Sequence, residues 1–124
     1  MAEVRLFMID LSKIENIYLY NGYTDLRKSI DGLVIIINDD FDISELKNKI
    51  FIFCNKGKDR LKIIEKDGTG FWLYQRRLSF GKFRWPRYKN GKLLIEKRQL
   101  LWLLEGLDVE QKYAHKEVNF ISAY

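Results

Sequence analysis

The 124-residue sequence contains very little of several residue types. Its single cysteine, Cys54, cannot form an intramolecular disulfide, and together with the lack of a signal-like start this favours a reducing, cytoplasmic location. One proline, and no proline-rich or serine-rich stretch, leave no linker at which to place a domain boundary. No apolar run approaches the roughly 20 residues needed to cross a bilayer, so the sequence predicts a soluble protein.

The remaining composition is typical of one compact domain. With 47% hydrophobic and 31% charged residues, the chain fits a single domain over residues 1–124 rather than a tail, a fibre or a multidomain assembly. We expect the core to lie within about residues 15–108, and a C-terminal extension over 109–124. Cys54 ends the apolar stretch 50–54, where a thiol behaves as a small hydrophobe, so we expect it to be buried.

The positive charge is concentrated in the middle of the chain. The formal net charge is +5, but residues 56–98 contain 14 lysines and arginines against four acids, which gives that stretch +10 and leaves the rest acidic. A basic surface of this size attracts polyanions at long range, and such binding weakens as salt is added. The alternative interpretation is a solvated surface that binds nothing specific.

Periodicity predicts alternating helices and strands. Residues 17–20 resemble a strand that ends at Asn21-Gly22, and a helix should follow with Thr24 as its N-cap and Asp25 near its positive end. The acidic stretch 38–42 should end this helix. A second helix is expected from about Lys97, with Gly106 at its C-terminal cap. The apolar stripes are Leu26, Ile30, Leu33 and Ile37 in the first helix, and Leu100, Leu101, Leu103, Leu104 and Leu107 in the second.

The strands are expected at 50–54, 61–66, 69–75, 83–85 and 93–95. Asp67-Gly68 should form a two-residue hairpin turn with positive φ at both positions. The predicted fold class is therefore α+β, an antiparallel β-meander of about four to six strands with helices packed on one face. If the other face is exposed, alternation should point Lys62, Arg76 and Arg84 outward together.

Two basic segments are candidates for nucleic-acid binding. Residues 75–87 interleave cations with aromatics, and residues 55–60 form a basic turn that lacks the spacing of a phosphate-binding P-loop. In the competing interpretation, Phe71, Leu73, Phe83 and Trp85 are core and the arginines between them are merely solvated. The candidate binding residues are Lys56, Lys58, Arg60, Lys62, Arg76, Arg77, Lys82, Arg84 and Arg87, with Arg27 and Lys28 as outlying additions.

No catalytic residue, metal or cofactor is predicted. Asp25 and Asp31, or the cluster of Asp39, Asp40 and Asp42, could in principle bind magnesium, but helix capping and solvation are simpler roles for them. His115 has no cysteine or histidine at zinc-ligand spacing, and no serine has a histidine base nearby. The sequence therefore predicts a protein that is not an enzyme.

Several ordered motifs resemble the TnpB-type accessory protein of insertion sequences of the 66 family. Residues 22–33 (Gly-Tyr-Thr-Asp-Leu-Arg-Lys-Ser-Ile-Asp-Gly-Leu) are similar to its opening motif, and residues 76–86 (Arg-Arg-Leu-Ser-Phe-Gly-Lys-Phe-Arg-Trp-Pro) are similar to its most specific one. The sequence departs from the family at Glu65-Lys66, where aromatics are common, and at Arg76, where lysine is usual. The matching motif positions are Thr24, Asp25, Arg27, Lys28, Asp31, Gly32, Gly68, Gly81, Phe83, Trp85 and Pro86.

The resemblance implies an accessory protein of transposition that acts beside a separate transposase. From the charge pattern we expect it to bind DNA through its basic surface, without catalysis. The rival hypothesis is a protein adaptor, in which Trp72, Trp85, Trp102 and the C-terminal aromatics contact the transposase or a second copy of the chain. A third hypothesis is a magnesium-dependent nuclease that uses Asp25 or Asp31.

Overall fold

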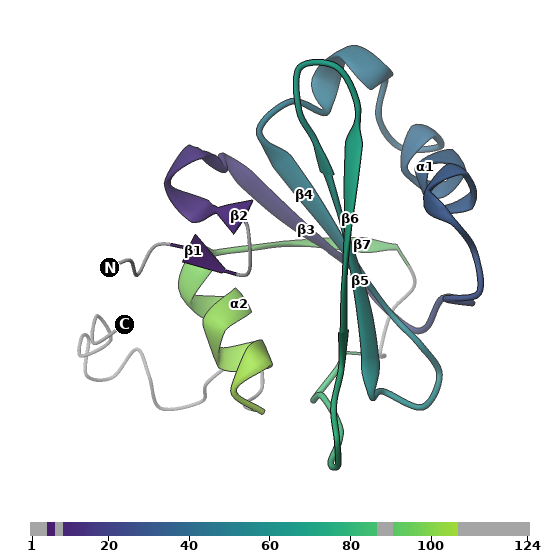
Figure 1. Ribbon diagram of the computed structural model, residues 1–124, viewed down its shortest axis with the longest axis vertical. Coiled ribbons are helices and arrows are strands. Elements are labelled where there is room, and N and C mark those ends of the chain that lie inside the picture. Colours follow the sequence, from purple (N-terminus) through teal and green to yellow (C-terminus); the bar gives the residue numbers. More distant parts are fainter. Residues whose placement is uncertain (1–4, 7–8, 87–90, 107–124) are drawn as a thin grey trace.

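The computed structural model describes residues 5–6, 9–86 and 91–106. Figure 1 shows a twisted sheet between two helices, with a small two-stranded ribbon near the start of the chain. Neither described helix is long and apolar enough to cross a membrane. The elements in chain order are β1 Arg5–Leu6, β2 Ile9–Asp10, the 3-10 helix η1 Leu11–Lys13, β3 Asn16–Tyr20, α1 Ile30–Asn38, the 3-10 helix η2 Ile43–Glu45, β4 Lys49–Cys54, β5 Arg60–Lys66, β6 Phe71–Arg77, β7 Lys92–Ile95 and α2 Lys97–Leu104.

The main sheet has five strands in the order β6-β5-β4-β3-β7, and it is mixed. Strands β4, β5 and β6 form an antiparallel meander, but β3 and β4 are parallel. The prediction of a purely antiparallel meander was therefore wrong. The chain between β3 and β4 includes α1, which returns it to the end where β3 began, and parallel neighbours need a connection of this kind.

Both faces of the sheet are covered, so the prediction of helices on one face was also wrong. Side chains alternate along each strand, and Ile50 and Ile52 join one buried cluster while Phe51 and Phe53 join another. Helix α2 packs on the first cluster through Leu100 and Leu103, and α1 packs on the second. We call the two sides the α2 face and the α1 face; Figure 1 shows the helices on opposite sides of the sheet.

Helix α1 begins at Ile30, five residues after the start predicted with Thr24 as N-cap. Thr24 donates its backbone N–H to the Cys54 carbonyl at 2.8 Å, which ties this segment to the end of β4. The Asp25 carboxylate accepts the backbone N–H of Arg27 at 3.0 Å, a local bond that competes with helix formation. Ser29 is the N-cap residue. The predicted apolar stripe is confirmed for Ile30, Leu33 and Ile37, which pack in the α1-face cluster, but Leu26 lies before the helix.

The β5–β6 hairpin turns through residues 67–70 instead of the predicted two-residue turn. Neither Asp67 nor Gly68 has a positive φ. The Asp67 carboxylate holds the loop by accepting the backbone N–H groups of Thr69 at 2.9 Å and Gly70 at 2.7 Å, and the indole N–H of Trp72 at 2.8 Å. These bonds lower the pKa of Asp67, and the two backbone N–H groups have the largest effect. The side chain, not the turn type, therefore sets the hairpin.

Residues 78–86 form no strand, although a strand was predicted at 83–85. Phe83 donates its backbone N–H to the Lys58 carbonyl at 2.7 Å, and the Trp85 indole donates to the Tyr20 carbonyl at 3.0 Å. Both side chains are buried in the α2-face cluster, as the core interpretation predicted. This segment runs from edge strand β6 toward β7 at the opposite edge, so its hydrogen bonds go to turns and strand ends.

The later elements follow the sequence pattern. Strand β7 and helix α2 were both predicted, and Gly106 has a φ of 87° just past the helix, as its role in the cap requires. Leu107 and the extension 109–124, with its aromatics and His115, lie outside the described residues.

Candidate nucleic-acid interface

The turn between β4 and β5 is a rigid support for basic side chains. The Asn55 side-chain oxygen accepts the backbone N–H groups of Asp59 and Arg60, both at 3.1 Å, and its amide donates to the Asp59 carboxylate at 2.8 Å. That last bond is the main reason why the pKa of Asp59 is lowered. Lys58 takes a positive φ of 62° at the bend. The turn therefore holds Lys56, Lys58 and Arg60 within one fixed loop.

Arg60 lies directly opposite Arg77 in the β5–β6 register. Directly opposite residues point to the same side of a sheet, and like charges in this position repel one another. No carboxylate in the described part of the chain forms an ion pair with either side chain. The two guanidinium groups therefore form a local concentration of positive charge, and a bound anion would relieve it.

Two further contacts bring distant cations to the same end of the sheet. The Lys62 ammonium donates to the Lys28 carbonyl at 2.9 Å, and the Lys82 ammonium donates to the Gly57 carbonyl at 2.9 Å. Each ammonium keeps donors for other partners, because it has three. The set joined in this way, here called the basic end, comprises Arg27, Lys28, Lys56, Lys58, Arg60, Lys62, Arg77 and Lys82.

A cleft of about 500 Å³ opens at the basic end. It is lined by residues 23–27 on one side and by residues 55–57 and Arg60 on the other. Arg27 forms a forked pair with Asp25, with Nε–Oδ1 at 2.9 Å and Nη2–Oδ2 at 2.7 Å, and these bonds hold the pKa of Asp25 far below its usual range. The Lys56 ammonium lies 5.6 Å from the centre of the Tyr23 ring. The cleft thus combines fixed cations with an aromatic ring that is 58% exposed.

Two predicted binding residues, Arg76 and Arg84, are not part of the basic end. Arg76 is opposite Leu61 and so points to the α2 face, whereas Lys62 is opposite Gln75 and points to the α1 face. Arg84 donates its Nε to the Gly106 carbonyl at 3.1 Å, beside the end of α2. The prediction that Lys62, Arg76 and Arg84 share a face was wrong. Lys62 pairs with Gln75, the residue before Arg76, and neighbouring residues of a strand point to opposite faces. Arg87 lies outside the described residues.

Comparison with known proteins identifies the chain's relatives. Residues 15–114 match the family described as IS66 Orf2 like protein. The chain belongs to this family. Two proteins of Sinorhizobium fredii (strain NBRC 101917 / NGR234) are similar to it. Their printed names are Uncharacterized protein y4hO, 32% identical over 74% of this chain and 80% of the relative, and Uncharacterized protein y4jC, 33% identical over 82% and 86%. No solved structure matches the chain.

Membership confirms the resemblance seen in the sequence. The IS66 Orf2-like family indicates an accessory protein of IS66 transposition, not a known catalytic enzyme, and it associates the chain with the IS66 transposition system. The family match spans β3 to α2, and so includes the five-stranded sheet and both helices.

The positions that were matched to the family motif from the sequence divide into three groups. Thr24, Asp25, Arg27 and Lys28 lie at the basic end, and Thr24 and Asp25 shape it through the bonds to Cys54 and Arg27. Five others are structural: Phe83, Trp85 and Pro86 are buried, Gly81 has a φ of 84°, and a Cβ on Gly32 would lie 3.1 Å from the Lys28 Cβ. Asp31 is exposed in the first turn of α1, and Gly68 lies in the hairpin loop with open space around it.

The predicted aromatic surface of this IS66 Orf2-like chain differs from the observed one. Trp85 and Trp102 are each only 5% exposed, so neither can form the adaptor surface that was predicted; Trp72 is 54% exposed. Sequence reasoning missed Tyr23 as a site residue. The sequence feature that could have indicated Tyr23 is its position directly before Thr24-Asp25. Its proximity to Lys56 is shown only by the structure.

Two of the acidic residues considered for magnesium, Asp25 and Asp40, have other side-chain partners. Asp25 is held by Arg27, and Asp40 accepts the Tyr20 hydroxyl at 3.0 Å and lies 3.7 Å from the Lys92 ammonium. Within residues 5–6, 9–86 and 91–106, no group of three or more histidine, cysteine or acidic side chains is arranged to hold a metal ion. The basic end, with its surplus of cations, is suited to binding an anion.

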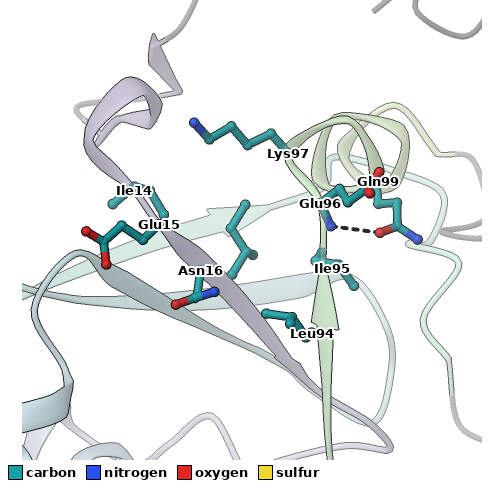
Figure 2. A pocket seen from close by; sticks show the side chains of 9 residues that line it. Ile14, Glu15, Asn16, Leu94, Ile95, Glu96, Lys97 and Gln99 are labelled. Carbon is teal, nitrogen blue, oxygen red and sulfur yellow. Dashed lines mark hydrogen bonds between the residues drawn. The ribbon is translucent and has the colours of Figure 1, made fainter.

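Two other clefts carry mixed charge. Figure 2 shows one of them, lined by Glu15 and Asn16 on the β3 side and by Glu96, Lys97 and Gln99 at the start of α2. Its volume is about 520 Å³. There the Gln99 side chain accepts the backbone N–H of Glu96 at 2.7 Å and so caps the helix. The second, of about 490 Å³, lies on the α2 face beside Trp72 and Tyr74. Neither has a surplus of cations comparable with that of the basic end.

Proposed function

We propose that this protein is a noncatalytic accessory protein of IS66 transposition that binds DNA through its basic end. The observation that carries the proposal is the set of eight cations on one end of the sheet, with Arg60 opposite Arg77. Of these eight, only Arg27 forms an ion pair within the described ranges. The others are available to phosphates, whose release of counterions drives this kind of binding.

The geometry fits a nucleic-acid backbone better than a small anion. The cations come from the segment before α1, the β4–β5 turn, both strands of the β5–β6 hairpin and the chain that follows it, so they extend along the end of the sheet. Arginine offers forked hydrogen bonds to phosphate oxygens, and lysine offers a compact charge. Contacts of this kind position DNA without reading its sequence.

The test is a titration of labelled DNA from the ends of an IS66 element, followed by fluorescence anisotropy at several salt concentrations. The variant Lys56→Ala/Arg60→Ala/Arg77→Ala should bind more weakly and should show a salt dependence shallower by about three, at roughly 0.9 per lost phosphate contact. The charge-matched control Lys13→Ala/Lys47→Ala/Lys97→Ala changes exposed lysines outside the basic end and should bind like the parent. Equal loss in the two variants would leave only a net-charge effect, and no binding by the parent at low salt would refute the proposal.

A protein adaptor is the second candidate, and exposed Trp72 favours it. Its ring stacks on Tyr74 at 6.5 Å, is fixed by the bond from its indole to Asp67, and borders the cleft of about 490 Å³. Pull-down with the transposase after nuclease treatment separates the two roles. An adaptor should retain the transposase and should lose it in Trp72→Ala, whereas a DNA-bridged association should disappear with the nucleic acid.

A further inference from the structure

Phe80 is the most exposed large hydrophobic residue of the described chain, at 89%. It lies at the tip of a short loop that is fixed at both ends. Leu78 donates its backbone N–H to the Asp59 carbonyl at 2.9 Å, and Phe83 donates to the Lys58 carbonyl at 2.7 Å. Gly81, with a φ of 84°, makes the bend. Figure 1 shows the chain after β6 reaching beyond the start of β5, at the bottom of the view.

The loop is anchored directly on the basic end. The two backbone bonds join the loop to the turn that holds Lys58, and the Lys82 ammonium closes on Gly57 at 2.9 Å. In the sequence, Phe80 lies between Arg77, the last residue of β6, and Lys82. Because these bonds already order the backbone, the binding of a ligand at Phe80 costs little conformational entropy of the loop.

The chemistry around Phe80 selects one class of ligand. A flat, exposed apolar ring on a loop that is anchored to the basic end is complementary to a molecule that presents flat apolar faces beside negative charges. Nucleic-acid bases and their phosphates have this arrangement, and proteins that bind single strands combine cationic grooves with exposed aromatic rings. In an intact duplex the base faces are covered by their neighbours, so a ring can reach them only where a base is unpaired or a step is opened.

We propose that Phe80 stacks on unpaired or unstacked bases, so that the basic end prefers single-stranded or distorted DNA over intact duplex. This inference rests on the proposed function and goes beyond it, because phosphate contacts alone would not distinguish these DNA forms. Tyr23, 58% exposed and capped by Lys56, provides a second ring at the same end.

The experiment compares three labelled DNAs with the full chain: a single strand, a matched duplex, and the same duplex with a central bulge. Phe80→Ala should weaken binding to the single strand and to the bulge by about 5- to 150-fold, the range for losing one base–aromatic stack. It should change duplex binding less, and it should leave the salt dependence unchanged because no charge is removed. Ile35→Ala, which removes an exposed hydrophobe from α1, is the matched control and should bind all three like the parent.

A base analogue gives a direct readout. 2-Aminopurine placed in the single strand should change fluorescence when the parent binds, and Phe80→Ala should lose most of that change. Circular dichroism should show both alanine variants folded, since each side chain is exposed. If Phe80→Ala binds all three DNAs like the parent, the stacking inference is overturned while the proposed function stands. If the parent binds none of the three DNAs at low salt, the proposed function and the stacking inference both fail. If Phe80→Ala binds DNA like the parent but no longer binds the transposase, Phe80 belongs to a protein interface and the stacking inference is overturned.

Discussion

Replacing Arg77 with glutamine should make the protein more stable and its DNA binding weaker. Arg77 faces Arg60 across the hairpin, and among the described residues no carboxylate is paired with either. With the charges taken as about 7 Å apart in water, their repulsion is about 0.6 kcal/mol. Arg77→Gln removes this repulsion and keeps a polar side chain of similar reach at an exposed strand position.

Salt and thermal unfolding measure the effect. At ~10 mM salt the Debye length of ~30 Å leaves most of the repulsion, and at ~1 M a length of ~3 Å removes nearly all of it. Arg77→Gln should therefore raise the melting temperature by about 2–3 °C at low salt and by almost nothing at high salt. In DNA titrations the same variant should show a salt dependence shallower by about one, because one phosphate contact is lost.

Arg76→Gln is the matched control. It removes the same charge one residue away, but Arg76 lies opposite Leu61 on the α2 face. Its melting temperature and DNA binding should stay close to those of the parent. If both variants gain the same stability at low salt, or if the gain from Arg77→Gln persists at ~1 M salt, cross-strand repulsion is not the cause.

Three further predictions concern the scaffold. Trp85→Phe should lower the free energy of unfolding in urea by about 1–3 kcal/mol, because the buried Tyr20 carbonyl loses the indole N–H at 3.0 Å; unchanged unfolding would show that this bond is dispensable. Burial, and then the hydrogen bond to Asp40, raise the pKa of Tyr20 in the folded state, so its contribution to stability is complete below the ordinary tyrosine pKa of about 10 and is lost as the pH rises beyond it. Tyr20→Phe should make stability fall less steeply above that pH in unfolding titrations, and an identical slope in parent and variant would contradict this. Gly81→Ala should destabilise the protein by about 1 kcal/mol because φ is 84°, whereas Gly68→Ala, with open space and no positive φ, should not; equal unfolding of the two variants would refute the backbone argument.

Local pattern was enough to predict most elements but not their arrangement. The strands around 17–20, 50–54 and 93–95 and helix α2 were predicted because apolar periodicity and turn residues act over a few positions. Strand order depends on pairing between distant segments, so the sequence did not reveal that β3 pairs with both β4 and β7. The start of α1 was missed for a similar reason: the bond from Thr24 to the Cys54 carbonyl exists only once β4 is in place.

The fold brings only some of the predicted binding residues together. The expected strand ended at residue 75, whereas β6 continues to Arg77 and so places Arg76 and Arg77 on opposite faces. Alternation would have separated these two arginines had the strand been extended. The roles of the aromatics could not be separated in this way, since Phe80 and Phe83 have similar sequence surroundings, and only the fold shows that one is exposed and the other is buried.

The pairing of β7 with β3 also affects the order in which the sheet can form during translation. Strands β4, β5 and β6 contact their neighbours in sequence and can form early, but β3 lacks one partner until residues 92–95 have been synthesised. For most of translation, one edge of β3 is therefore unpaired in the nascent chain, and this strand carries the apolar residues Ile17 and Leu19. A chain that ends before residue 92 would keep β3 as an unpaired edge strand, whose free N–H and C=O groups can pair with another chain. Such a truncated product should aggregate instead of persisting as a smaller folded protein.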